Sequence, residues 1–418
     1  MTLLKLVAGL VLLAAKAASS PVEAAVEVPN WWTKPQFDCP LWKGTLPNGY
    51  QDLAGTKCGN AKTKTYTGGF ITARLYEIPG AWQKAPRYTE IVKGTGDAIK
   101  KGLATFGSLA NPGPLAINIG IAWGGIGELI KVDDNNSGQK SPCYILINFP
   151  PEWNDVPLAA LQKDIIGRMY QCVEQYHRPT VTTWTEANKW WRRGIARYFD
   201  GLSYPAKAGD FLTEGLYPEE YHYGVPLYQN SDAASLFFHF ADQLGGWSPA
   251  DVHSWMKTHP NKAKYDDELA SLSADSRITP SLWHRFILAS IDGTIKYPSG
   301  QKITNTQGGV PSRDQSGTVD LAVGAAYSRS VSISSFKGAI NVFTVKAGQT
   351  LRLSVETEPG VEWSVRKVGT AAWNSGARTR TVDLVAGGQG TVKYQIALGS
   401  TKNGPGGYIA KVGMKRTV

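Results

Sequence analysis

The strongest hydrophobic pattern in the chain predicts two helices between residues 158 and 205. From Leu158 to Tyr176, apolar residues recur at the three- and four-residue spacing that marks one face of a helix. Pro179 should end this helix, because proline cannot continue it. A second helix is expected after Thr185, a good N-cap residue, and is expected to end at Gly201.

Periodicity elsewhere predicts strands before these helices and more helices after them. The expected strands are Thr67–Ile78, Ala116–Ala122 and Cys143–Phe149, and a helix is expected over Tyr88–Phe106. Residues 209–298 have helical spacing. Helix starts are expected at Ser231, Ser248 and Thr279, and proline follows the last two at an early helical position.

The composition changes near residue 300, where Gly, Ser, Thr and Gln replace apolar residues. We therefore expect a linker over 301–317. Beyond it, short alternating runs are separated by Gly and Pro turns, as is typical of an antiparallel β-sandwich, here residues 318–418. The runs are Ile340–Val345, Leu351–Val355, Val361–Val365, Val382–Val385, Val392–Leu398 and Tyr408–Val412.

The N-terminus reads as a targeting segment. Residues 1–24 contain a lysine, a short apolar run and then small residues, which predicts a secretory signal peptide. A Trp- and Pro-rich arm over 25–64 follows, and no later stretch has the apolar length of a membrane span. We expect a secreted, extracellular protein, glycosylated at Asn135 in the sequon Asn135-Asn136-Ser137.

Composition and charge narrow the class of partner. At 418 residues and 42% hydrophobic, the chain is long enough for two domains. Its formal net charge is +10, and most of the surplus lies in residues 313–418. For a secreted protein, this charge favours an acidic polysaccharide or an anionic cell surface over nucleic acid. The alternative is ordinary solubility charge.

The second predicted helix carries a resemblance to a known family. A long helix followed by Trp-Trp-x-x-Gly-x-Ala-x-Tyr resembles the core of the HExxH zinc metallopeptidases of the gluzincin type. The matching residues are Trp190, Trp191, Gly194, Ala196 and Tyr198. The resemblance covers roughly residues 65–300. It implies an α+β protein, with a zincin-like domain of a mixed sheet and a helical lobe ahead of the β-sandwich.

The same resemblance implies that the metal site has been lost. The HExxH motif aligns with Gly167, Arg168 and Gln171 at its chemical positions, and the third ligand position is Arg193. A second register, Arg168–Cys172, would put two residues of the apolar stripe at those positions. Zinc takes imidazole, thiolate or carboxylate ligands, whereas arginine is a permanent cation. No catalytic residue, metal or other cofactor is therefore expected.

Arg168, Arg193, His177 and Tyr198 are the candidate binding residues of the resulting cleft. A buried guanidinium needs an anion beside it, and the nearest carboxylates in the sequence are Glu174, Glu186 and Asp200. One interpretation is that an internal salt bridge fills the place of the metal. The others are an anion-binding pocket, or two arginines that face solvent.

The cysteines and tryptophans allow further predictions. Four cysteines in a secreted chain predict two disulfides with three possible connectivities. We favour Cys39–Cys58, which closes a short loop, and Cys143–Cys172, which the zincin-like topology would bring together. Exposed tryptophans stack on sugar rings, so a glycan site could include any of these four: Trp31, Trp32, Trp363, Trp373.

These residues together predict a secreted, non-catalytic pseudopeptidase that binds an extracellular glycan or protein. The alternative is an active secreted hydrolase, peptidase or glycan-cleaving, that uses other residues of the same cleft. None of the six histidines forms an i,i+4 pair, so each is interpreted as a core or surface residue.

Overall fold

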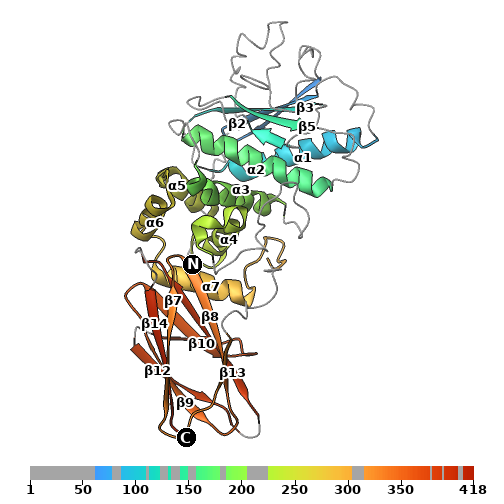
Figure 1. The fold of residues 1–418 in the computed structure, drawn as a ribbon. Coiled ribbons are helices and arrows are strands. Elements are labelled where there is room, and N and C mark those ends of the chain that lie inside the picture. Colours follow the sequence, from blue (N-terminus) through green and yellow to red (C-terminus); the bar gives the residue numbers. More distant parts are fainter. Residues whose placement is uncertain are drawn as a thin grey trace, which may run out of the picture.

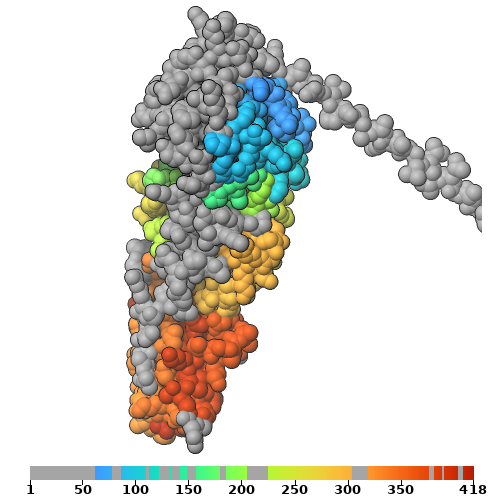
Figure 2. Space-filling model, turned by 90° about the vertical axis from the view of Figure 1, so that its right-hand side faces the viewer, coloured from blue at the N-terminus to red at the C-terminus, as the bar shows by residue number. Residues whose placement is uncertain are grey.

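The computed structural model describes residues 62–77, 86–109, 113–122, 130–132, 142–148, 157–178, 185–204, 225–303, 315–376, 379–387, 390–402 and 408–418. These residues form an elongated molecule, with a sheet at one end, helices in the middle and a β-sandwich at the other end (Figure 1). The space-filling view shows the same progression along the long axis, from the N-terminal region to the C-terminal region (Figure 2).

The first sheet has five strands in the order β1-β2-β3-β5-β4. Its strands are β1 Lys62–Gly68, β2 Ile71–Glu77, β3 Leu115–Ala122, β4 Ile130–Val132 and β5 Cys143–Asn148. β2, β3 and β5 run parallel, while β1 and β4 are antiparallel edge strands. The prediction of one strand over Thr67–Ile78 is wrong, because Gly69, at φ 56°, turns the chain back into a β1–β2 hairpin.

Two long helices cover one face of this sheet. Helix α1 (Tyr88–Phe106) lies against β1 and β2, and helix α2 (Leu158–His177) lies against β3, β4 and β5 (Figure 1). Both predicted helices are confirmed, and Ile165, Ile166 and Met169 in the apolar stripe of α2 are completely buried. The mixed sheet and its helices give the first part of the chain an α+β fold.

A third layer packs on the other side of α2. It contains the short helix η7 (Glu186–Asn188), α3 (Lys189–Ser203), η9 (Leu227–Gln229), η10 (Ser231–Ala234), α4 (Ser235–Gln243), α5 (Pro249–Thr258), α6 (Tyr265–Ala274) and α7 (Pro280–Asp292). The predicted caps at Ser248 and Thr279 are confirmed: each side chain accepts a hydrogen bond from the backbone N–H three residues later. Ser231 instead begins the short helix η10, ahead of α4.

The limits predicted for the second helix need correction. Thr185 does not cap it, because its hydroxyl donates to the carbonyl oxygen of Lys262 at 2.5 Å. Gly201 does not end it either, since α3 continues to Ser203. A side chain at Gly201 would put its Cβ 2.9 Å from the His239 ring, so this glycine allows close packing of α3 against α4.

The C-terminal region is a β-sandwich of two sheets around a separate apolar core. One sheet has the order β11-β10-β13-β8-β6 and the other β12-β9-β14-β7. The strands are β6 Gln315–Val319, β7 Ala326–Ile333, β8 Lys337–Val345, β9 Thr350–Glu356, β10 Val361–Lys367, β11 Asn374–Gly376, β12 Thr379–Val385, β13 Val392–Ser400 and β14 Tyr408–Arg416. All pairs are antiparallel except β6–β8, and β6 begins ahead of the expected boundary at residue 318.

Helix α7 joins the helical layer to the sandwich (Figure 1). Trp283 packs where Gly399 has no side chain, and a Cβ on Gly399 would lie 3.3 Å from the indole. His284 Nε2 lies 2.8 Å from the Ser364 hydroxyl on β10, within hydrogen-bond distance. The Asp292 carboxylate accepts a hydrogen bond from the Trp373 indole at 2.9 Å. The two regions therefore share a packed, hydrogen-bonded interface.

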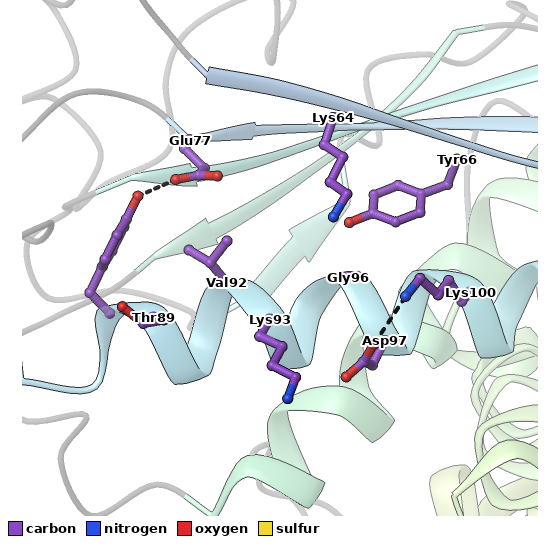
Figure 3. Close-up of a pocket in the computed structure, with 10 residues that line it drawn as sticks. Lys64, Tyr66, Glu77, Thr89, Val92, Lys93, Gly96, Asp97 and Lys100 are labelled. Carbon is purple, nitrogen blue, oxygen red and sulfur yellow. Dashed lines mark hydrogen bonds and ion pairs between the residues drawn. The ribbon is translucent and has the colours of Figure 1, made fainter.

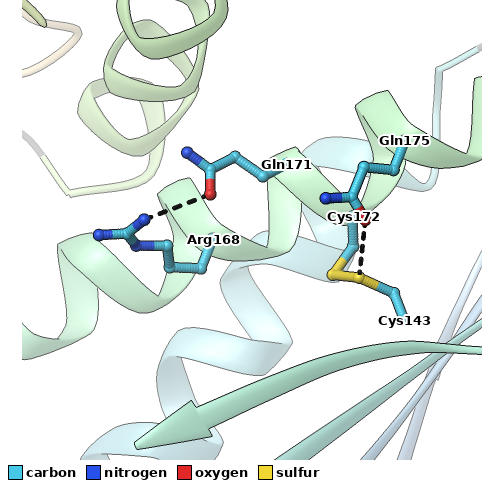
Figure 4. Close-up of a disulfide and its surroundings, with 5 residues drawn as sticks. All are labelled: Cys143, Arg168, Gln171, Cys172 and Gln175. Atoms are coloured by element: carbon cyan, nitrogen blue, oxygen red, sulfur yellow. Dashed lines mark hydrogen bonds between the residues drawn. A yellow bond between two sulfur atoms is a disulfide. The ribbon is translucent and has the colours of Figure 1, made fainter. Parts of the chain in front are cut away.

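One disulfide ties the sheet to α2. Cys143 on β5 is bonded to Cys172 on α2, as expected (Figure 4). Disulfides persist in oxidising compartments, so this bond agrees with export from the cytosol. The helices in the described residues are too short or too polar to cross a membrane. The Cys39–Cys58 pairing, Asn135, Trp31, Trp32, the signal peptide and most of the arm lie outside the described residues.

Candidate functional site

The three positions aligned with zinc ligands are Gly167, Gln171 and Arg193, and Arg168 aligns with the general base; these residues lie on α2 and α3, which pack against each other. Gly167 is buried, and a Cβ there would lie 3.4 Å from Oδ2 of Asp200 on α3. Arg168 and Gln171 share one side of α2, and the Arg168 guanidinium donates to Gln171 Oε1 at 3.4 Å (Figure 4). Arg193 projects from α3 and its side chain is 43% exposed. None of the four reaches a free carboxylate or imidazole that could complete a metal site.

The centre of this region is Arg197, one turn after Arg193 on α3. Its guanidinium lies 3.1 Å from Asp164 on α2, 3.1 Å from Asp200 on α3 and 3.7 Å from Asp232 on η10. All three carboxylates are almost completely buried. One buried cation thus holds together three structural elements that are distant in the chain.

Arg168 and Arg193 are the two ends of this set of ion pairs. Arg168 Nε lies 3.5 Å from Asp164, and Arg193 Nε lies 3.9 Å from Asp232. Lys163, itself buried, contacts Asp200 at 3.6 Å. We refer to these residues as the arginine–aspartate network: Lys163, Asp164, Arg168, Arg193, Arg197, Asp200 and Asp232.

The predicted carboxylate partners of Arg168 and Arg193 are not the ones that the structure shows. Glu174 and Asp200 do form buried ion pairs, but Glu174 pairs with Arg192 at 3.2 Å and Asp200 with Arg197. Glu186 pairs with Lys189 at the surface instead. Of the three interpretations of Arg168 and Arg193, the internal salt bridge is the one that describes both residues, although Arg193 also faces solvent.

Gly194 explains how η10 comes close enough to supply Asp232. A Cβ on Gly194 would lie 3.1 Å from the Ala234 side chain, so the missing side chain lets α3 and η10 pack in close contact. Trp190 and Trp191 are completely buried and both rings pack against His259, and the Trp190 indole donates to Glu268 at 2.8 Å. Gly194 thus makes room for the element that supplies Asp232, and the two tryptophans pack in the core.

Burial and the neighbouring charges shift the pKa values of the network residues in opposite directions. Desolvation raises the pKa of Asp200 to about 6, and Lys163 and Arg197 limit the increase. The three carboxylates keep Arg197 charged and raise the pKa of its guanidinium, although desolvation alone would lower it. A pKa near neutrality is typical of acid–base catalysts, but Asp200 is completely buried and out of reach of a substrate.

The residues present do not fit a zinc ion. Lys163 and Arg197 already occupy the space beside the buried carboxylates, and both are cations. Gly167 has no donor, and the Arg168 and Arg193 side chains would repel a metal. No catalytic step through a metal can be derived from this arrangement.

His177 and Tyr198 lie outside the network. His177, at the end of α2, packs its ring against His253 with centroids 4.6 Å apart, and burial lowers its pKa to about 4. Tyr198 is completely buried, packs edge-on against His239 and lies beside Asp242. Burial raises the pKa of this phenol well above its usual value. Both side chains act in packing rather than in an open cleft.

The tryptophans predicted to contact sugars are also placed differently. Trp363 is completely buried in the sandwich core, so it cannot stack on a ligand. Trp373 is half-buried at the interface with α7, where the Arg366 guanidinium covers its ring at 4.2 Å. Burial therefore excludes Trp363 from sugar stacking, and Arg366 already occupies one face of Trp373.

Sequence reasoning missed Arg197, Asp164 and Asp232. Arg197 lies at an unassigned position of the matching motif, and Asp164 lies within the apolar part of helix α2. A charged residue among apolar positions on a helix face is a signal for a buried ion pair, and it could have identified Asp164. Asp232 could not have been found, because the η10 contact depends on tertiary packing.

Comparisons with known proteins add little to this geometry. No family model matches the sequence, and no curated protein matches it. A periplasmic inhibitor of g-type lysozyme from Aeromonas hydrophila is 16% identical, covering 24% of this chain and 93% of its own, with a TM-score of 0.19. The pre-peptidase C-terminal domain of a collagenase from Bacillus anthracis is 15% identical, covering 25% of this chain and 97% of its own, with a TM-score of 0.16. TM-scores this low carry no inference about this chain.

Proposed function

We propose that this chain is a secreted, non-catalytic binding protein on a zincin-like scaffold, a pseudopeptidase whose metal site has been replaced by ion pairs. The observation that carries the proposal is Arg197. Its buried guanidinium lies within 3.7 Å of three buried carboxylates at the junction of α2, α3 and η10. A cation at this point excludes a divalent metal by charge and by volume.

The order of elements supports the scaffold assignment. A mixed sheet, with three parallel strands between two antiparallel edge strands, precedes the long helix α2, and α3 follows it with the Trp-Trp-x-x-Gly-x-Ala-x-Tyr spacing. Gly167, which aligns with the first histidine of HExxH, lies opposite Ala196 and Asp200 on α3. It therefore faces the helix that carries Arg193, the residue aligned with the third ligand. The HExxH alignment requires these two helices to face each other, and this contact supports the proposal.

The exposed end of the network supports a binding role. Arg193 is 43% exposed and its only ion pair among the described residues is the long one to Asp232, at 3.9 Å. Its guanidinium can therefore meet a second carboxylate at the surface, and arginine binds carboxylates through two parallel hydrogen bonds. The proposed partner is an extracellular glycan or protein that presents such an acidic group.

Metal analysis and a binding assay test the proposal. We expect purified protein to contain zinc far below one equivalent and to show no chelator-sensitive cleavage of casein. On an array of acidic and neutral glycans and acidic peptides, we expect retention of carboxylated probes, and Arg193→Gln should weaken it. The matched control is Arg352→Gln, at an exposed ion pair on the sandwich, which should leave retention unchanged. Stoichiometric zinc, or cleavage that a chelator stops, would end the pseudopeptidase reading.

A further inference from the structure

A hollow of about 480 Å³ lies between the β1–β2 hairpin and helix α1. This volume is within the range of small-molecule sites, roughly 300–1,000 Å³. None of its lining residues belongs to the arginine–aspartate network. The lining is Lys64, Tyr66, Glu77, Tyr88, Thr89, Val92, Lys93, Gly96, Asp97 and Lys100 (Figure 3).

The walls of the hollow combine aromatic rings with a glycine. Tyr66 and Lys64 extend from β1 toward α1, where Val92 and Gly96 face them (Figure 3). A Cβ on Gly96 would lie 2.5 Å from the Tyr66 hydroxyl, so this glycine leaves room for the phenol. Glycine inside a helix is unfavourable by about 1 kcal/mol relative to alanine. Glycine at this position therefore makes room for the Tyr66 ring in the wall of the hollow.

The charges around the hollow are unequal. It has three lysines and two carboxylates, and both carboxylates already have partners: Glu77 accepts a hydrogen bond from Tyr88, and Asp97 pairs with Lys100 at 3.4 Å. Among the described residues, neither Lys64 nor Lys93 has a carboxylate partner. The Lys64 ammonium lies 5.5 Å from the centre of the Tyr66 ring. The lining therefore has one positive charge more than its carboxylates balance.

We propose that this hollow binds a monoanionic sugar, a uronate being the simplest example. The flat side of a sugar ring stacks on tyrosine rings such as those of Tyr66 and Tyr88. Its hydroxyl groups suit the Glu77 and Asp97 oxygens as donors, and its carboxylate suits the Lys64 ammonium. A neutral sugar has the same ring and hydroxyl groups but offers nothing to the Lys64 ammonium.

This inference deepens the proposed function, because it names a ligand class for a binding protein. It takes from that function only the premise that the protein binds its ligand without cleaving it. The binding site itself is independent, because the hollow and the network have no residue in common. The ligand would lie at the edge strand β1 and the outer side of α1, in the part of the molecule opposite the sandwich (Figure 1).

Titration calorimetry of the full chain tests the site with glucuronate, glucose and inorganic sulfate as probes. We expect glucuronate to bind at least about tenfold more tightly than glucose, which is the effect of one charge-assisted hydrogen bond. Sulfate should not compete at equal concentration, because it has no ring or hydroxyl groups. Equal affinity for glucose, or equal competition by sulfate, would overturn the assignment of an acidic sugar.

Two variants test whether glucuronate binds in this hollow. Lys64→Gln should weaken glucuronate binding at least about tenfold. Gly96→Ala should weaken it by displacing Tyr66 into the hollow, while a cooperative thermal transition shows that the fold is kept. The control Lys62→Gln removes an exposed lysine from the same strand without touching the lining, and it should change affinity less than twofold.

The outcomes separate this inference from the proposed function. Absence of glucuronate binding, or binding that neither variant changes, would refute the proposed sugar site in this hollow and leave the pseudopeptidase proposal intact. Stoichiometric zinc would refute that proposal without altering the glucuronate result.

Discussion

Removing the Arg197 guanidinium is the most direct test of the arginine–aspartate network. In Arg197→Met, each of the three buried carboxylates loses its shortest ion pair, at 3.1, 3.1 and 3.7 Å. Asp200 then keeps only Lys163, at 3.6 Å. Asp164 and Asp232 keep Arg168 and Arg193, whose side chains reach solvent. Breaking one side of a buried ion pair typically costs about 3–5 kcal/mol, so we expect a loss of unfolding free energy of that size at pH 8.

The loss should be smaller at acidic pH. The pKa of Asp200 is already raised from 3.8 to about 6, and removal of Arg197 takes away a group that lowers it. Between the unfolded and the folded pKa, the folded state binds the extra proton, so lowering the pH stabilises the folded variant by about 1.4 kcal/mol per unit of pKa difference. We expect the deficit relative to the wild type to shrink from pH 8 to pH 5.

Urea unfolding followed by tryptophan fluorescence measures both effects. Arg193→Met is the matched control, because its side chain is 43% exposed and its ion pair is 3.9 Å long. It should change the unfolding free energy by about 0–1 kcal/mol. If Arg197→Met costs no more than Arg193→Met at pH 8, or if its deficit does not depend on pH, the network is not what holds these elements together.

Two further predictions concern acid sensitivity and the disulfide. His239 is completely buried between Tyr198 and Tyr297, and desolvation, with Lys163 nearby, lowers its pKa to about 3. The unfolded state therefore binds a proton that the folded state excludes, and stability should fall by about 1.4 kcal/mol per unit as the pH drops below 6.5. His239→Leu should flatten the slope of unfolding free energy against pH between 6.5 and 4, and an unchanged slope would contradict this. The Cys143→Ala/Cys172→Ala variant opens a loop of 29 residues and should lose about 3.5 kcal/mol, measured as a lower melting temperature that reducing agent no longer changes.

Sequence patterns predicted the helices well because helix formation depends on neighbours in the chain. The limits Tyr88–Phe106 match α1, and the caps at Ser248 and Thr279 were found from residues within one turn. The β1–β2 hairpin was missed although Gly68 and Gly69 mark a tight turn, since the alternating pattern continues on both sides of it. In the sandwich, the short strand β11 and the exposed strand β7 were missed because their apolar alternation is weak.

For the candidate site, the sequence by itself determined that Gly167, Arg168 and Arg193 offer no zinc ligand and that Gln171 is a poor one, because that follows from side-chain chemistry alone. Only the tertiary structure decided which charges meet. Asp164, Arg197 and Asp232 come from three elements far apart in the chain, and the packing of α3 against α2 and η10 brings them within 3.7 Å. A buried charge is stable only beside a compensating one, and the fold, rather than the spacing along the chain, supplies that neighbour.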